Sequence, residues 1–331
     1  MWMRLAVVAS MVFAGCASLA VSMAPKKEAK GDERPLAKAV TEDFWKALHG
    51  GRYEDIAPLL ERHKQAYLTH PYDADIAAHT GFLHMWRIAE SARSPELVAG
   101  ITDDMSMARV YFGDAVQLRP DWALVQGFWA STVLAEGAIH KDEARVRDGY
   151  FKMEDAVAMW PELNLFTKAI MLAQTRHDSP QYAQAVEAFW KNVEVCADGT
   201  PDRKNPDFSK FARPDANDPK KAICFNTWKA PYNFEGSMLV FGDLLVKQGE
   251  VEPAKKVYAS AKASKNFEQW PYRAVLEARL ANAAANVEAF RVEPREQKAE
   301  EKKFITGSAF TCTVCHQKEG APALGSTTAS R

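Results

Sequence analysis

The sequence predicts an all-α protein. Apolar residues recur every three or four positions from about Leu36 to Phe290, the spacing of helices that bury one face. Turn residues interrupt this pattern at short intervals, and no stretch shows the alternation that is typical of strands. The 331 residues are 47% hydrophobic and 26% charged, which is enough for a sizeable core. We therefore expect a helical body over residues 36–290.

The N-terminal segment indicates export. Residues 1–15 are typical of a secretory signal peptide, since Arg4 precedes an apolar run that is too short to span a membrane. This run ends in "FAGC", which resembles the lipobox of bacterial lipoproteins. The resemblance implies cleavage before Cys16 and acylation of that cysteine, so that lipid anchors the chain to a membrane. The alternative is an ordinary signal peptide with a chance cysteine.

The segment after the lipobox and the overall charge bear on the location of the protein and on its partners. Residues 16–35 are small, charged and aperiodic, which favours a flexible tether. A lipoprotein of this type lies on the periplasmic face of a bacterial membrane, and Ala17 in place of aspartate favours the outer membrane. The formal net charge of -1 provides no basic field for nucleic acid, which we exclude as a partner.

The helix breaks also indicate repeats. In "FGDLLVKQGEVEPAKKVYASAKAS", Gly242 lies twelve residues before Ala254, and Tyr258 and Ala261 follow at offsets of 4 and 7. This spacing resembles a tetratricopeptide repeat, in which small residues let antiparallel helices approach while an aromatic ring fills the groove. The resemblance implies an irregular repeat body that docks partners. An irregular helical bundle is the alternative. Weaker copies of the spacing fall at residues 108–120, 137–161 and 66–71.

The stretch "CTVCH", residues 312–316, resembles the attachment motif of c-type cytochromes. The resemblance implies one covalent haem c, with thioether bonds to Cys312 and Cys315 and with His316 as an axial iron ligand. A zinc site would need further ligands, and a thioredoxin-like pair would need a strand before the motif. A chance occurrence or a plain disulfide is the remaining alternative.

Two further cysteines lie in an irregular insertion. Residues 195–232 hold five prolines and many polar residues, so we expect a long loop between helices. Once Cys16 and the motif are assigned, Cys196 and Cys224 remain, and in an exported protein we expect them to form a disulfide.

The motif lies in a short tail. We expect residues 291–305 to be a charged linker and residues 306–331 to be the haem-binding tail, which swings beside a body without a porphyrin pocket. Neither Met nor His occurs after His316, so any second axial ligand comes from the body or from another chain. The stretch "HTGFLHMW" offers His79 or His84 on one helix.

Two classes of function follow from these features. The first is an exported, membrane-anchored mono-haem cytochrome that transfers electrons to redox proteins docked on the repeats. The second is a protein-interaction scaffold whose haem is structural or senses redox state or a gas. No nucleophile elbow, phosphate loop or metalloprotease helix occurs, and we predict no catalytic residues. An enzymatic use of an open iron position ranks third, because the tail alone cannot build a distal pocket.

Overall fold

The computed structural model describes residues 28, 35–90, 100–212, 219–292 and 312–320. Every regular element within these ranges is helical, so the predicted all-α fold is confirmed. The α-helices are α2 (Pro35–Gly50), α3 (Ile56–Thr69), α4 (Ala74–Ala89), α5 (Ile101–Leu118), α6 (Ala123–His140), α7 (Glu143–Met159), α8 (Pro161–Leu172), α9 (Pro180–Ala197), α10 (Asn233–Gln248), α11 (Val251–Ser260), α12 (Arg273–Ala281), α13 (Asn286–Arg291) and α14 (Cys312–His316).

The helix ends fall where the sequence places its turn residues. Asp73 and Ser179 cap α4 and α9, because their side chains accept hydrogen bonds from the first backbone N–H groups of those helices. Pro161 and Pro180 occupy the first turns of α8 and α9, where the missing N–H costs nothing. Gly249 ends α10 with a φ of 104°, a conformation that glycine adopts without strain.

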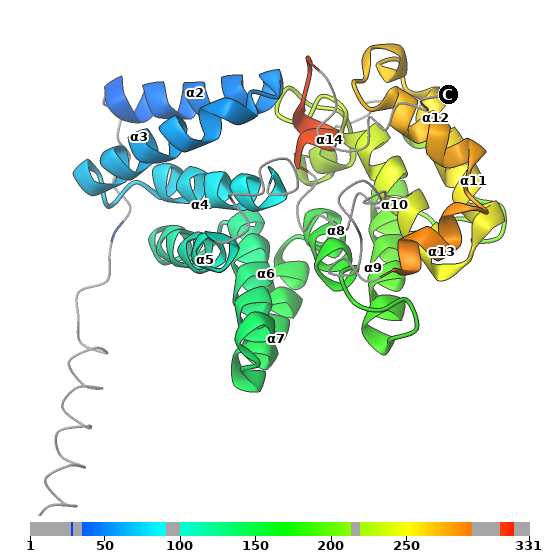
Figure 1. Cartoon of the computed structure of the whole chain (residues 1–331), viewed down its shortest axis with the longest axis horizontal. Helices are drawn as coiled ribbons and strands as arrows, with labels where there is room; N and C mark the ends of the chain where they lie inside the picture. Colours follow the sequence, from blue (N-terminus) through cyan, green and yellow to red (C-terminus); the bar gives the residue numbers. More distant parts are fainter. Residues whose placement is uncertain (1–27, 29–34, 91–99, 213–218, 293–311, 321–331) are drawn as a thin grey trace, which may run out of the picture.

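Consecutive helices pack as antiparallel pairs, α4 with α5, α6 with α7, α8 with α9 and α10 with α11 (Figure 1). Small residues stand where the helices of a pair come closest. A Cβ atom on Gly149 would lie 2.5 Å from the backbone nitrogen of Leu134, and one on Gly242 would overlap the ring of Tyr258. Both glycines belong to the spacing that predicts repeats, and their close contacts agree with the role of small residues in it.

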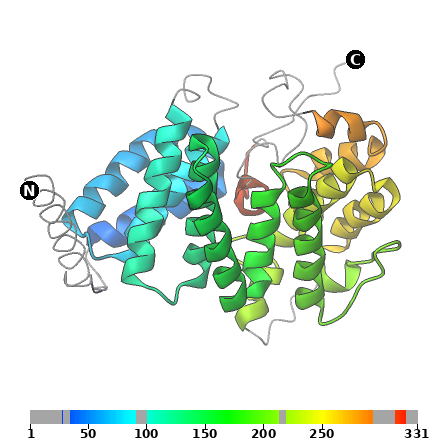
Figure 2. The ribbon, with the colours of Figure 1, turned by 90° about the horizontal axis from the view of Figure 1, so that it is seen from below.

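The helices follow one another around a curved body, and α14 lies between α2 and α10 (Figures 1 and 2). The largest apolar core is built by α8 to α13, where the rings of Phe189 and Phe241 stack at 4.3 Å. A separate cluster joins α2, α3 and α4 around Phe44 and Trp86. The short helix α14 therefore lies between two separately packed regions.

The insertion between α9 and α10 is held against the body. It contains two 3₁₀ turns, Ser209–Ala212 and Pro219–Cys224, and Cys196 and Cys224 form the disulfide that the sequence predicts. Phe208 is fully buried, and its backbone N–H donates to the hydroxyl of Ser260 at 3.1 Å.

Several sequence-based predictions concern segments outside the described residues. These are the signal peptide over 1–15, the lipidation of Cys16, nearly all of the tether over 16–35, the linker over 291–305 beyond residue 292, and the tail over 306–331 apart from 312–320. Among the helices that the structure describes, none combines the length and the apolar character needed to cross a bilayer.

Candidate functional site

The CxxCH motif forms α14, which is one short helical turn held from the C-terminal side of the body. The indole N–H of Trp270 donates to the carbonyl of Val314 at 2.9 Å. The backbone N–H of Tyr232 donates to the carbonyl of Cys315 at 3.1 Å, and the hydroxyl of Tyr272 bonds that of Thr313 at 2.7 Å. The first two bonds occupy carbonyl groups near the end of the turn, which a helix of this length cannot pair internally.

The residues after the motif are held from the N-terminal side. The hydroxyl of Tyr53 donates to the Gln317 side chain at 2.6 Å, and the backbone N–H of Lys318 donates to the carbonyl of His49 at 2.7 Å. The described part of the tail is therefore docked on the body from both sides. This finding contradicts the expectation that the motif swings freely. The docking was not predicted because its contacts come from aromatic residues scattered along the chain.

His316 is oriented by a backbone carbonyl. Its Nδ1 lies 2.6 Å from the carbonyl oxygen of Lys229, and because a carbonyl only accepts, Nδ1 carries the proton. The other nitrogen, Nε2, then holds a free lone pair in the neutral ring. Burial lowers the pKa of His316 to about 4, so the ring stays neutral at physiological pH. A neutral imidazole with a fixed tautomer is the form that binds a metal ion.

Cys312 and Cys315 are free thiols that line the same cavity as His316. A Cβ atom on Gly236 would overlap the Cys315 sulfur, so α10 provides space for that thiol through a glycine. Burial raises the pKa of Cys312 to about 12 and also raises the pKa of Cys315. Thioredoxin-like pairs use a thiolate, which forms when the pKa is lowered. The raised pKa values of these two thiols do not match that chemistry.

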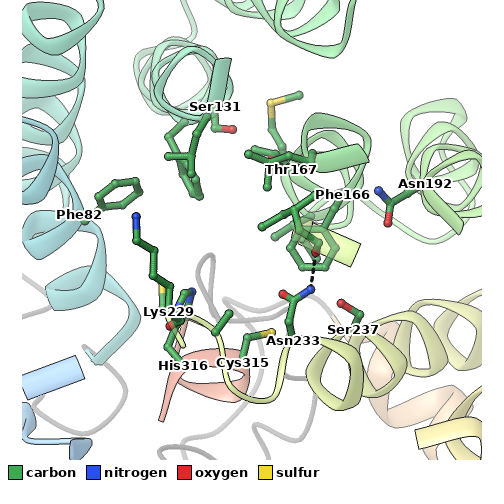
Figure 3. Close-up of a pocket in the computed structure, with 18 of the residues that line it drawn as sticks. Phe82, Ser131, Phe166, Thr167, Asn192, Lys229, Asn233, Ser237, Cys315 and His316 are labelled. Atoms are coloured by element: carbon green, nitrogen blue, oxygen red, sulfur yellow. Dashed lines mark hydrogen bonds between the residues drawn. The ribbon is translucent and has the colours of Figure 1, made fainter. Parts of the chain in front are cut away.

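The cavity has a volume of about 970 Å³ (Figure 3). Figure 3 shows Phe82, Phe166 and Lys229 around it, with His316 and Cys315 at one end and Ser131 and Thr167 opposite. Pockets for organic ligands span roughly 300 to 1,000 Å³ and are mostly apolar with few polar groups. The body therefore contains a cavity of the size that an organic ligand needs, where the sequence led us to expect none. The pocket is assembled from side chains on α2, α4, α5, α6, α8, α9, α10, α14 and the insertion, and no single stretch of sequence encodes it.

The two candidate distal ligands are placed differently. His79 lines the cavity, whereas His84 does not and instead bonds Asp104 through Nδ1 at 2.8 Å while its ring stacks on Tyr111 at 5.7 Å. The offset of five positions from His79 to His84 explains the difference, because each residue turns an α-helix by about 100°. Burial lowers the pKa of His79 to about 3.

The site includes residues that sequence reasoning did not find. The Trp45 ring lies 6.1 Å from that of His316 and 5.5 Å from that of Trp228, which is 62% exposed. The ammonium group of Lys229 lies 5.6 Å from the centre of each indole, and no other Lys or Arg of the described chain lines the cavity. The signal that could have identified Trp228 and Lys229 was the run of aromatic and basic residues "TWKAPY" within a polar loop.

The disulfide also borders this cavity, since Cys196 and Cys224 both line it.

Among the predicted site residues, Cys312, Cys315, His316 and His79 line one cavity, and His84 lies outside it. Within the described ranges, no cluster of three or more His, Cys, Asp or Glu side chains is arranged to hold a metal ion.

No protein-family model matches this chain, and neither the curated proteins nor the solved structures contain a match.

Proposed function

We propose that this protein is an exported mono-haem c-type cytochrome that transfers electrons. The observation that carries the proposal is the position of Cys312, Cys315 and His316 on one docked turn at the wall of a large apolar cavity. The residues present fit the cofactor, because two neutral thiols, one oriented imidazole and space of the appropriate size lie together. Haem, when bound, supplies an iron centre that gains and loses one electron.

Each residue of the motif has a distinct task in this proposal. Cys312 and Cys315 would hold the cofactor through thioether bonds, and His316 would bind iron through Nε2 while Lys229 fixes its tautomer. The Lys229 ammonium group is the one cation in the described lining and would compensate a propionate. The apolar walls would exclude water, which keeps the local dielectric low and tunes the potential.

The aromatic contacts support electron transfer over a purely structural haem. Trp45 contacts His316, and Trp228 contacts Trp45 and reaches solvent. A redox partner docked at Trp228 would then lie within two ring contacts of the iron ligand. Such a surface needs no pocket for the partner, since electron-transfer encounters use small interfaces.

The helical pairs support the further proposal that the body is a tetratricopeptide-like repeat array that docks partners. Gly242 packs against Tyr258 in the α10–α11 pair, and Gly149 approaches Leu134 in the α6–α7 pair. Close approach of paired helices at small residues is what such a repeat spacing would produce. Redox proteins would be the docked partners.

The second candidate function is a scaffold whose haem senses a gas or redox state. The size of the cavity and the polar side chains of Ser131, Thr167 and Asn192 in its lining favour it. These groups lie across the cavity from His316 in Figure 3 and could bond a small ligand. They also supply the distal pocket that the tail alone cannot build.

Expression in an exporting bacterium with a haem-attachment system tests the proposal. We expect the intact mass to include one haem and the Cys312→Ala, Cys315→Ala double variant to lose it. Val314→Ala, between the two cysteines, serves as the control and should keep the cofactor. Absence of haem from the unaltered exported protein contradicts the proposal. Reversible one-electron titration without carbon monoxide binding favours electron transfer, and rapid carbon monoxide binding favours the sensor.

The membrane anchor is a separate proposal and has its own test. If "FAGC" is a working lipobox, the exported protein fractionates with membranes, probed by density separation of the inner and outer membranes. Cys16→Ser should release it or block its processing, and this substitution has no reason to change the haem spectrum. A soluble periplasmic protein that begins at another residue would refute the anchor.

A further inference from the structure

We infer that His79 of α4 is the second axial ligand of the iron, opposite His316. The inference rests on the proposed haem site and names the body residue that completes it. The resulting coordination, with two imidazoles on one iron, is a low-spin centre suited to electron transfer.

The placement of His79 is the first reason. It lines the cavity that also contains Cys312, Cys315 and His316. The Trp45 ring lies 5.9 Å from that of His79 and 6.1 Å from that of His316. The two imidazoles are therefore no farther apart than the sum of these distances. No other histidine of the described chain lines the cavity with His316.

The second reason is the way the ring is held. The side chain of His79 is 8% exposed, and its ring is stacked on Phe44 at 4.6 Å and edge-on to Trp45. Its Nδ1 is buried without a hydrogen-bond partner, so this atom does not reach the cavity, and a bond to iron would come from Nε2. An imidazole that packing fixes at the cavity wall is preorganised for a ligand.

The competing side chains are less suited to this role. His84 bonds Asp104 and lies outside the lining, and His49 also lies outside it and contacts the Lys229 carbonyl at 3.0 Å. Three methionines line the cavity, but thioethers are apolar groups that pack in cores without needing a polar partner. They are Met105, Met171 and Met238.

Spectroscopy of the exported, haem-loaded protein tests the inference. We expect the unaltered protein to give low-spin optical and electron paramagnetic resonance spectra of two imidazole ligands, with no carbon monoxide binding. His79→Ala should lose the low-spin signal, bind carbon monoxide, and regain the low-spin spectrum when free imidazole is added. His79→Met should remain six-coordinate with a higher reduction potential, because a thioether favours ferrous iron.

Two control variants separate ligation from packing. His84→Asn removes a buried histidine from the same helix, and His63→Leu removes an imidazole whose ring lies 6.4 Å from that of His79. Both should keep the low-spin spectrum. Rescue of His79→Ala by imidazole would show that the variant is folded, and His79→Met gives a second result if alanine is not tolerated.

The outcomes distinguish the inference from the function on which it rests. Absence of covalent haem in the unaltered protein refutes the proposed function itself. Covalent haem with an unchanged spectrum in His79→Ala overturns the inference alone. So does a spectrum of methionine coordination, or a high-spin iron that binds carbon monoxide in the unaltered protein.

Discussion

The α10–α11 pair and the α2–α4 side of the cavity bury polar side chains in opposite ways. In the pair, the Tyr258 hydroxyl donates to Asp243 at 2.5 Å, and the Lys247 ammonium group donates to two backbone carbonyls at 3.1 and 2.9 Å. On the other side, the buried atoms His63 Nε2 and His79 Nδ1 have no hydrogen-bond partner. In the first region these buried polar groups are hydrogen-bonded, and in the second region these two buried nitrogen atoms are not.

This difference indicates which region is built for stability and which for binding. A satisfied buried network contributes to the unfolding free energy, whereas an unpartnered imidazole subtracts from it. Proteins accept such local losses mainly at functional sites. Of the two histidines, His79 lines the cavity that the CxxCH helix also borders, which agrees with the haem site proposed there.

The largest effect that this comparison predicts is that the protein loses stability in acid. Burial lowers the pKa of His63 from 6.5 to about 4, so the unfolded chain binds more protons between these values. Stability should therefore fall as pH drops from 6.5 towards 4. Because a tenfold change in proton concentration is worth about 1.4 kcal/mol, the loss over this interval is roughly 3 kcal/mol.

Urea denaturation of the purified protein at pH 7 and pH 4.5 measures this loss. His63→Leu should have a flatter pH profile and be more stable than the unaltered protein at the lower pH. Equal slopes for both proteins would mean that His63 is not buried as described.

A smaller effect concerns the close contact within the α10–α11 pair. In Gly242→Ala, the new methyl group would overlap the Tyr258 ring, and overpacking of this kind costs about 1 to 3 kcal/mol. Gly199→Ala is the matched control, since a Cβ atom there meets nothing within 4 Å. Thermal denaturation of both variants checks the expectation, and equal melting temperatures would contradict it.

The smallest difference is expected when the two kinds of buried polar group are compared directly at neutral pH. Tyr258→Phe should destabilise the protein by about 2 kcal/mol, because a buried carboxylate loses a hydrogen-bond donor. His63→Leu should change stability by less than about 1 kcal/mol, since removing the unsatisfied Nε2 offsets the loss of the hydrogen bond between Nδ1 and the Leu59 carbonyl. Chemical denaturation at pH 7 gives both values, and a larger loss for His63→Leu would reverse the comparison.

Much of the scaffold could be predicted from the sequence, and much of the site could not. Turn residues such as Pro161 and Gly249 act locally, so the helix ends followed from the letters themselves. The pairing of Cys196 and Cys224 could be predicted because the other three cysteines already had assigned roles. The cavity did not, because it depends on which faces of distant helices meet. Helical geometry alone could have separated His79 from His84, since five positions place them on different faces.

The hydrogen bond between Tyr53 and Gln317 joins residues 264 positions apart. Contacts of such long range form late, after the local helix pairs have folded. Until α14 docks, the indole of Trp270 and the hydroxyl of Tyr272 lack the partners it provides, and the apolar cavity lacks part of its wall. A chain truncated after Phe304 would therefore keep its helices but expose this surface to proteases. Docking of the motif would then protect the aromatic surface of the body from cleavage.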